Sequence, residues 1–167
     1  EQRLLVLRAA VGALARLETD DAARTLITLA KGDGVRREAA LGMMGHCRRL
    51  SVAKALADAL DARPSDVAEV KRIASALADV GNSWAWRTPE VKAQAEEGAV
   101  RQTAAEALLR AYLHYDGEAR QAALHGILVV DAPNTELMIE AAKKRAGEGG
   151  RAALETLQAR YAKNPTR

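Results

Sequence analysis

The fold of this chain is decided by one stretch, Val100-Arg101-Gln102-Thr103-Ala104-Ala105-Glu106-Ala107-Leu108-Leu109-Arg110-Ala111-Tyr112. Val100, Ala104, Leu108 and Ala111 lie three or four positions apart, so they share one face of a helix. Polar and charged side chains occupy the other face. Because alanine stands at several positions of the apolar face, a neighbouring helix can approach closely. The stretch therefore predicts a helix that packs within stacked helix pairs.

The same pattern recurs along the chain: an aliphatic residue, a basic residue, two variable positions and then small residues. Copies begin at Val35, Val70, Val100 and Ala119, and a weaker copy surrounds Val6. This pattern resembles the HEAT-repeat family of α-solenoids, in which each unit is two antiparallel helices stacked on the next pair. The resemblance implies an all-α fold, a right-handed α-α superhelix of about four helix pairs with a C-terminal capping helix.

The spacing of the copies sets the expected domain organisation. The interval from Val100 to Ala119 has room for only one helix and a turn, so we interpret 100–114 as the second helix of its pair. The expected units of a single domain over 1–167 are pairs at about 2–31, 35–62, 66–114 and 118–146, an insertion at 83–98, and a cap at 151–162.

The insertion carries its own helix signal. Thr88-Pro89-Glu90 has the order of a helix cap, a first helical residue and an acidic second position. We therefore expect a helix that begins at Pro89 and runs toward Gly98.

Composition narrows the class of protein. Apolar residues make up 49% of the chain but aromatic residues only 3%, and phenylalanine is absent, so Ala, Leu, Val and Ile must fill the core. The net charge of +3 is too small to indicate nucleic-acid binding by itself. No apolar run approaches the roughly 18 residues of a membrane helix, so we expect no membrane span. The single Cys47 favours a reducing, cytoplasmic location.

Few residues offer chemistry. His46 adjoins Cys47, but a structural zinc site normally needs four ligands, and neither His114 nor His125 is spaced to complete one. Some metal enzymes that resemble this fold carry His-Glu dipeptides, and this chain has none. His114 and Asp116 could form a base with an orienting carboxylate, or simply a polar helix end. We expect no catalytic residue, no metal site and no cofactor, and hence a protein that is not an enzyme.

The most unusual segment is Trp84-Ala85-Trp86-Arg87, in a chain almost free of aromatic residues. Trp and Arg are the residue types that most often dominate binding interfaces. Alternatively, one Trp fills the gap left by the insertion while the other covers it, so that one is buried and one exposed. Further candidate contacts lie on the expected second helices, namely Arg24, Thr28, Lys54, Asp58, Lys143 and Lys144.

The expected function is a non-enzymatic protein-protein interaction module, a scaffold that binds a partner protein on its concave face or at the aromatic insertion. The first alternative is nucleic-acid binding or repair, because alkylpurine DNA glycosylases are built of similar repeats with Trp and Arg in a basic cleft. A ladder of basic residues would serve that function, made of Arg36, Lys71, Arg101 and Arg120. A lyase resembling the bilin lyases is a further alternative that no particular residue supports.

Overall fold

The computed structural model describes residues 2–165, and over this range the chain is built of helices without any strand. The predicted all-α class is confirmed. The helices are α1 (Gln2–Ala15), α2 (Asp20–Ala30), α3 (Gly34–Met43), α4 (Leu50–Asp61), α5 (Val67–Gly81), α6 (Ser83–Trp86), α7 (Glu97–His114), α8 (Gly117–Val130), α9 (Thr135–Arg145) and α10 (Glu148–Ala162), with 3-10 turns η1 (Met44–His46) and η2 (Gln94–Glu96).

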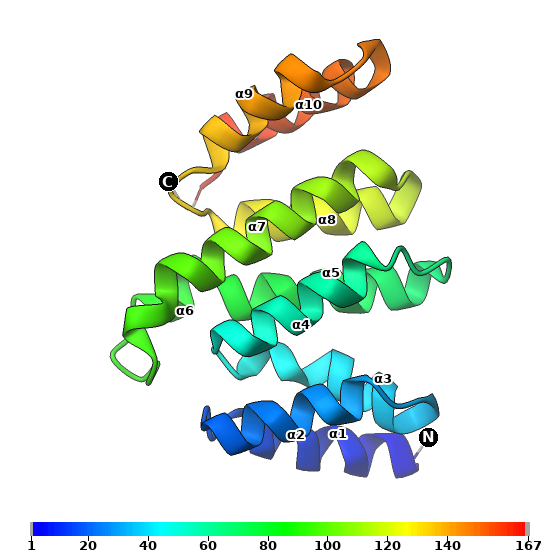
Figure 1. Ribbon diagram of the computed structural model, residues 1–167, viewed down its shortest axis with the longest axis vertical. Coiled ribbons are helices and arrows are strands. Elements are labelled where there is room, and N and C mark those ends of the chain that lie inside the picture. Colours follow the sequence, from blue (N-terminus) through cyan, green and yellow to red (C-terminus); the bar gives the residue numbers. More distant parts are fainter. Residues whose placement is uncertain (1, 166–167) are drawn as a thin grey trace.

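The long helices stack in two layers (Figure 1). One layer contains α1, α3, α5 and α8, each packed against the next, and the other contains α2, α4, α7 and α9. α10 packs against α9 and also reaches α7, so α1 and α10 lie at opposite ends of the stack. α5 sits in the middle, in contact with α3, α4, α7 and α8.

Polar side chains fix where several helices begin. The Thr19 hydroxyl accepts a hydrogen bond from the Ala22 amide at 3.1 Å, at the start of α2. The Asp66 carboxylate accepts one from the Ala68 amide at 3.0 Å, at the start of α5. Each such cap satisfies an amide that has no partner within its helix.

Arginine side chains close several helix ends. Arg37 donates to the Ala30 carbonyl at the end of α2, and Arg101 donates to the Val130 carbonyl at the end of α8. Arg120 donates to the Tyr115 carbonyl at 2.7 Å, just after α7. The last carbonyls of a helix lack helical partners and carry partial negative charge, so a guanidinium there supplies both hydrogen bonds and opposite charge.

Close approach of backbones at glycine replaces the packing that aromatic rings would give. A Cβ at Gly45 would lie 2.4 Å from the Ala76 carbonyl oxygen and 2.9 Å from Asp79 Cβ, so η1 rests directly on α5. A Cβ at Gly126 would lie 2.9 Å from both Leu108 methyl groups, where α8 meets α7. The helices can approach this closely only because these side chains are absent.

The insertion differs from the expectation. No helix begins at Pro89; residues 88–93 form turns, η2 follows, and α7 begins at Glu97. Tertiary contacts explain why the expected helix does not form. Val91 is buried, the Lys92 amide donates to the Glu18 carboxylate at 3.1 Å, and the Glu96 carboxylate accepts from the Leu50 amide at 2.6 Å. These contacts hold the segment across the α1–α2 turn and the start of α4, which outweighs the local helix signal.

Substitution of Gly45 by alanine tests the close approach. The added methyl group would meet backbone atoms that cannot move aside, so we expect Gly45→Ala to lower the free energy of unfolding by about 2–3 kcal/mol. Gly98 in α7 is the matched control, because nothing lies within 4 Å of a Cβ there. Gly98→Ala should leave stability unchanged or raise it by up to about 1 kcal/mol. Urea unfolding followed by circular dichroism measures both, and equal stability of the two variants would contradict this packing.

Candidate functional site

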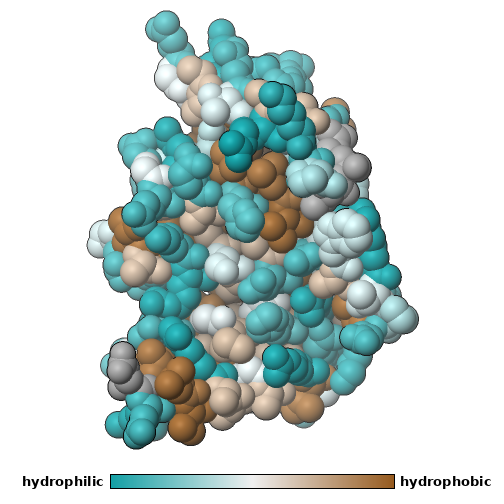
Figure 2. Space-filling view, turned by 180° about the vertical axis from the view of Figure 1, so that it is seen from behind, coloured by the Kyte–Doolittle hydropathy of each residue, from teal (hydrophilic) through white to brown (hydrophobic). Residues whose placement is uncertain are grey.

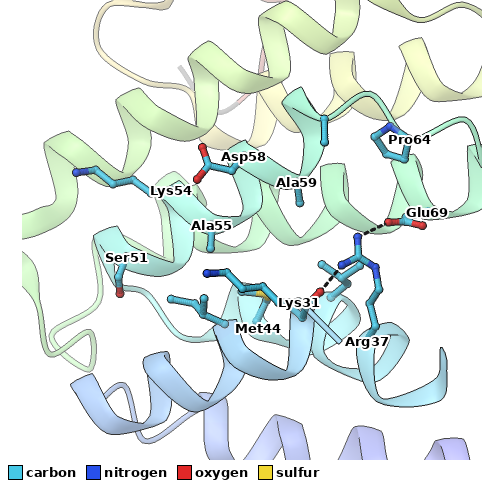
Figure 3. Close-up of a pocket in the computed structure, with 14 residues that line it drawn as sticks. Lys31, Arg37, Met44, Ser51, Lys54, Ala55, Asp58, Ala59, Pro64 and Glu69 are labelled. Atoms are coloured by element: carbon cyan, nitrogen blue, oxygen red, sulfur yellow. Dashed lines mark hydrogen bonds and ion pairs between the residues drawn. The ribbon is translucent and has the colours of Figure 1, made fainter. Parts of the chain in front are cut away.

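A groove of about 680 Å³ runs between α2 and α4 (Figure 3). Its chemistry is mainly that of short and apolar side chains. Leu41 and Met44 lie beneath it and are almost completely buried, which makes the floor rigid. The apolar lining consists of Ile27, Ala30, Leu41, Met44, Ala55, Ala59, Ala62 and Pro64.

The groove exists because α4 presents small side chains toward α2. Ser51, Ala55, Ala59 and Ala62 follow one another at intervals of three or four residues, so they form one stripe on the helix. Each of these side chains is too short to reach across to α2. On another side α4 packs against α7, and a smaller pocket of about 270 Å³ lies there near the C-terminal ends of both helices. The larger open space beside α4 is therefore on the α2–α4 side.

Charged side chains border the groove unevenly. The Arg37 guanidinium pairs with the Glu69 carboxylate at 2.6 Å and closes the end near Pro64. Lys31 and Lys54 differ, because neither ammonium has a hydrogen bond or ion pair to any residue in 2–165. Figure 3 shows Lys31 lying along the groove toward the end marked by Ser51, and Lys54 extending toward the same end. This end thus carries two ammonium groups that form no ion pair within residues 2–165.

The side chains proposed from the sequence do not form one site. Of them, only Lys54 and Asp58 line the α2–α4 groove. Arg24 lies exposed on α2, paired with Asp21. Lys143 donates to Gln158 at 2.8 Å between α9 and α10, at the other end of the stack. Arg24 and Lys143 are thus already engaged within the chain.

The tryptophan pair divides into one buried and one exposed ring. Trp86 is 2% exposed, and its indole N–H donates to the Val80 carbonyl at 2.8 Å, so the expectation that it contacts a partner is wrong. Trp86 belongs to the apolar core, and its hydrogen bond joins α6 to α5. Trp84 is 59% exposed, and the Arg87 guanidinium lies 5.0 Å from its ring centroid. This cation–π pair on α6 stays a candidate contact.

A polar junction joins the insertion to the first two helix pairs. Glu18 is buried, and its carbonyl accepts a hydrogen bond from Arg49 at 3.1 Å. Glu96 pairs with the same arginine at 3.4 Å. Cys47 is buried beside this junction. Burial, and then the negative charge of Glu18, raise the pKa of the Cys47 thiol to about 11. The junction holds the chain together and leaves its thiol protonated, so it is not a nucleophilic site.

Two of the histidines, His114 and His46, lie beside other titratable side chains. The His114 ring meets the Tyr115 ring edge-on, with centroids 4.7 Å apart. Near His46, burial raises the pKa of Asp79, while the positive charges of His46 and Arg48 oppose that shift. Among residues 2–165, no group of three or more His, Cys, Asp and Glu side chains is placed to hold a metal ion.

The repeated basic positions are mostly neutralised within the chain. Lys71 pairs with Glu118 at 2.7 Å, and Arg101 pairs with Glu97 at 2.6 Å. Arg120 pairs with Asp116 at 2.7 Å. A nucleic-acid ladder needs guanidinium and ammonium groups that are free to meet phosphates. At these three positions the charges already face carboxylates.

Comparison with known proteins adds no family. No family model matches the chain, and no curated protein or solved structure matches it. Within the described part of the chain, none of the helices has the length and apolar character needed to cross a membrane.

Cys47 gives a prediction for alkylation by iodoacetamide. A thiol with a pKa of about 11 is almost wholly protonated near pH 8, whereas an unfolded cysteine with a pKa near 8.5 is partly thiolate. We expect alkylation of the folded protein at about pH 8 to be roughly 200-fold slower than in urea. Because folding raises this pKa, stability should also fall as pH rises from about 8.5 toward 11. Equal alkylation rates in the folded and unfolded chain would contradict the burial of Cys47.

Proposed function

We propose that this protein is a non-enzymatic interaction module that binds a segment of a partner protein in the groove between α2 and α4. One observation carries the proposal: a rigid groove of about 680 Å³ has an apolar floor and is bordered by two ammonium groups without partners in 2–165. Sites of this kind bind partners by burying apolar side chains and orienting them with a few polar groups.

The energetics favour such binding. The groove walls are helices already held by their own contacts, so the protein side pays little ordering cost when a partner arrives. Leu41 and Met44 are fixed in the core below, and Ala55 and Ala59 have no side-chain torsions to lose. Apolar side chains of a partner that enter the groove would be removed from water, and this contributes most of the affinity.

We also propose a superhelical architecture and a cytoplasmic location for this protein. The repeated sequence pattern and the two layers of packed helices support a HEAT-like, right-handed superhelix whose inner face is formed by α2, α4, α7 and α9. The exposed Trp84–Arg87 pair on α6 is proposed as a second contact for the same partner. A cytoplasmic setting is supported by Cys47, which is unpaired and reduced. The nucleic-acid alternative has less support, because three of its four basic positions, Lys71, Arg101 and Arg120, are paired with carboxylates.

A groove-filling substitution tests the proposed function. Selection from a library of short random peptides, displayed on phage, should enrich binders on the wild-type protein. Ala55→Trp places an indole in the groove, and we expect it to reduce binding of those peptides by more than about tenfold.

Ala152→Trp is the matched control, because Ala152 is exposed on α10, far along the chain from the groove. It should bind the enriched peptides as the wild type does, and circular dichroism should show equal helix content in all three proteins. Peptides that bind the wild type and the Ala55→Trp protein equally would rule out the groove as the binding site.

A further inference from the structure

We infer that the α2–α4 groove selects peptide segments in which an acidic side chain lies next to an aliphatic one, with the carboxylate received by Lys31 and Lys54. This inference rests on the proposed function and names the chemistry of the partner. It follows from two features of the same groove: the apolar floor, and the uneven distribution of charge at its two ends.

The apolar floor of the groove explains why the bound peptide segment should contain an aliphatic side chain. Met44 lies beneath the groove between the two helices, and Ala55 faces it from α4 (Figure 3). Ile27 borders it from α2 and is only partly buried. An aliphatic side chain would cover these atoms, whereas a small hydrophilic ligand would leave them in contact with water. The groove therefore fits a partner with an apolar group.

The charged side chains at the two ends of the groove determine where an acidic residue of the bound segment would lie. At the closed end the charges of Arg37 and Glu69 already satisfy each other at 2.6 Å. At the open end Lys31 and Lys54 come from different helices and have no partner in 2–165. Asp58 is the other charged group of the lining, and in Figure 3 Lys54 and Asp58 extend from the same side of α4, above the edge that carries Ala55 and Ala59. A carboxylate at this end would thus meet the Lys31 ammonium beside the floor and the Lys54 ammonium at the rim.

Lys31 is the C-terminal cap residue of α2, and in Figure 3 its side chain runs back along the groove, away from that helix end. Lys54 lies two turns from the end of α4 on the exposed side of the small-residue stripe. Lysine binds as a flexible point charge rather than as a planar fork, so it accepts a carboxylate in several positions along a peptide. Lys31 and Lys54 therefore favour a negatively charged peptide but do not require one particular peptide sequence.

Charge-reversed proteins and altered peptides provide the test. The peptides enriched on the wild type should contain Asp or Glu beside Leu, Ile, Val or Met more often than the starting library does. For the strongest enriched peptide, replacing the acidic residues by Gln should weaken binding about fivefold, and replacing them by Lys should weaken it further. Added salt should lower the affinity of the acidic peptide more than that of its Gln counterpart.

Lys31→Glu combined with Lys54→Glu should invert this order, so that the Lys peptide binds more tightly than the acidic one. Lys163→Glu is the control for a change of surface charge, because Lys163 follows α10 at the other end of the stack. It should preserve the wild-type order. Fluorescence anisotropy of the labelled peptides measures each affinity.

The outcomes separate the two proposals. Enriched peptides without acidic residues, or equal binding of the acidic and Gln peptides, would overturn the inference; if Ala55→Trp still abolished their binding, the groove itself would stand. Binding that Ala55→Trp leaves unchanged would overturn both.

Discussion

Close approach of helix backbones is the constraint on which this structure depends. The core has almost no aromatic rings, so van der Waals contact must come from short side chains and from backbone. Gly45 against α5 and Gly126 against Leu108 show how this is achieved. The same use of small residues explains the groove. Where Ala55 and Ala59 face a helix that stays at a distance, their short side chains leave open space instead of a packed contact.

Electrostatics then decides which charges remain for a partner. Arg37, Arg101 and Arg120 each bind helix-end carbonyls and a carboxylate within the chain, so they fasten one helix to another. Their charges are satisfied internally. Lys31 and Lys54 are not used in this way, although they line the same groove as Arg37. Because the arginines are paired within the chain and these two lysines are not, the apolar groove is expected to prefer a partner that carries negative charge.

The sequence predicted the class of fold well, because helical spacing such as Val100, Ala104, Leu108 and Ala111 depends on local periodicity alone. It could not predict the path of 88–96, where contacts with Glu18 and Leu50, far away in the chain, override a good helix start at Pro89. The HEAT-repeat membership and the superhelix stay predictions.

The candidate site was predicted only in part. Lys54 and Asp58 were singled out, but Lys31 and the floor were missed. The spacing of Ser51, Ala55, Ala59 and Ala62 was visible in the sequence as a stripe of small residues. What was not visible is that α2 leaves this stripe uncovered, since the distance between two helices depends on the packing of the whole stack. The burial of Trp86 rather than Trp84 depended on tertiary contacts in the same way.

The central claim is that the α2–α4 groove is where a partner binds, and the methionine methyl groups test it most directly. The chain has three methionines in three places: Met44 beneath the groove, Met43 against Gly12 of α1, and Met138 beside α7. An NMR titration of the protein, labelled at its methionine methyl groups, with an enriched peptide should shift the Met44 signal and leave Met43 and Met138 nearly unchanged. A shift at Met138 with none at Met44 would place binding elsewhere and contradict this account.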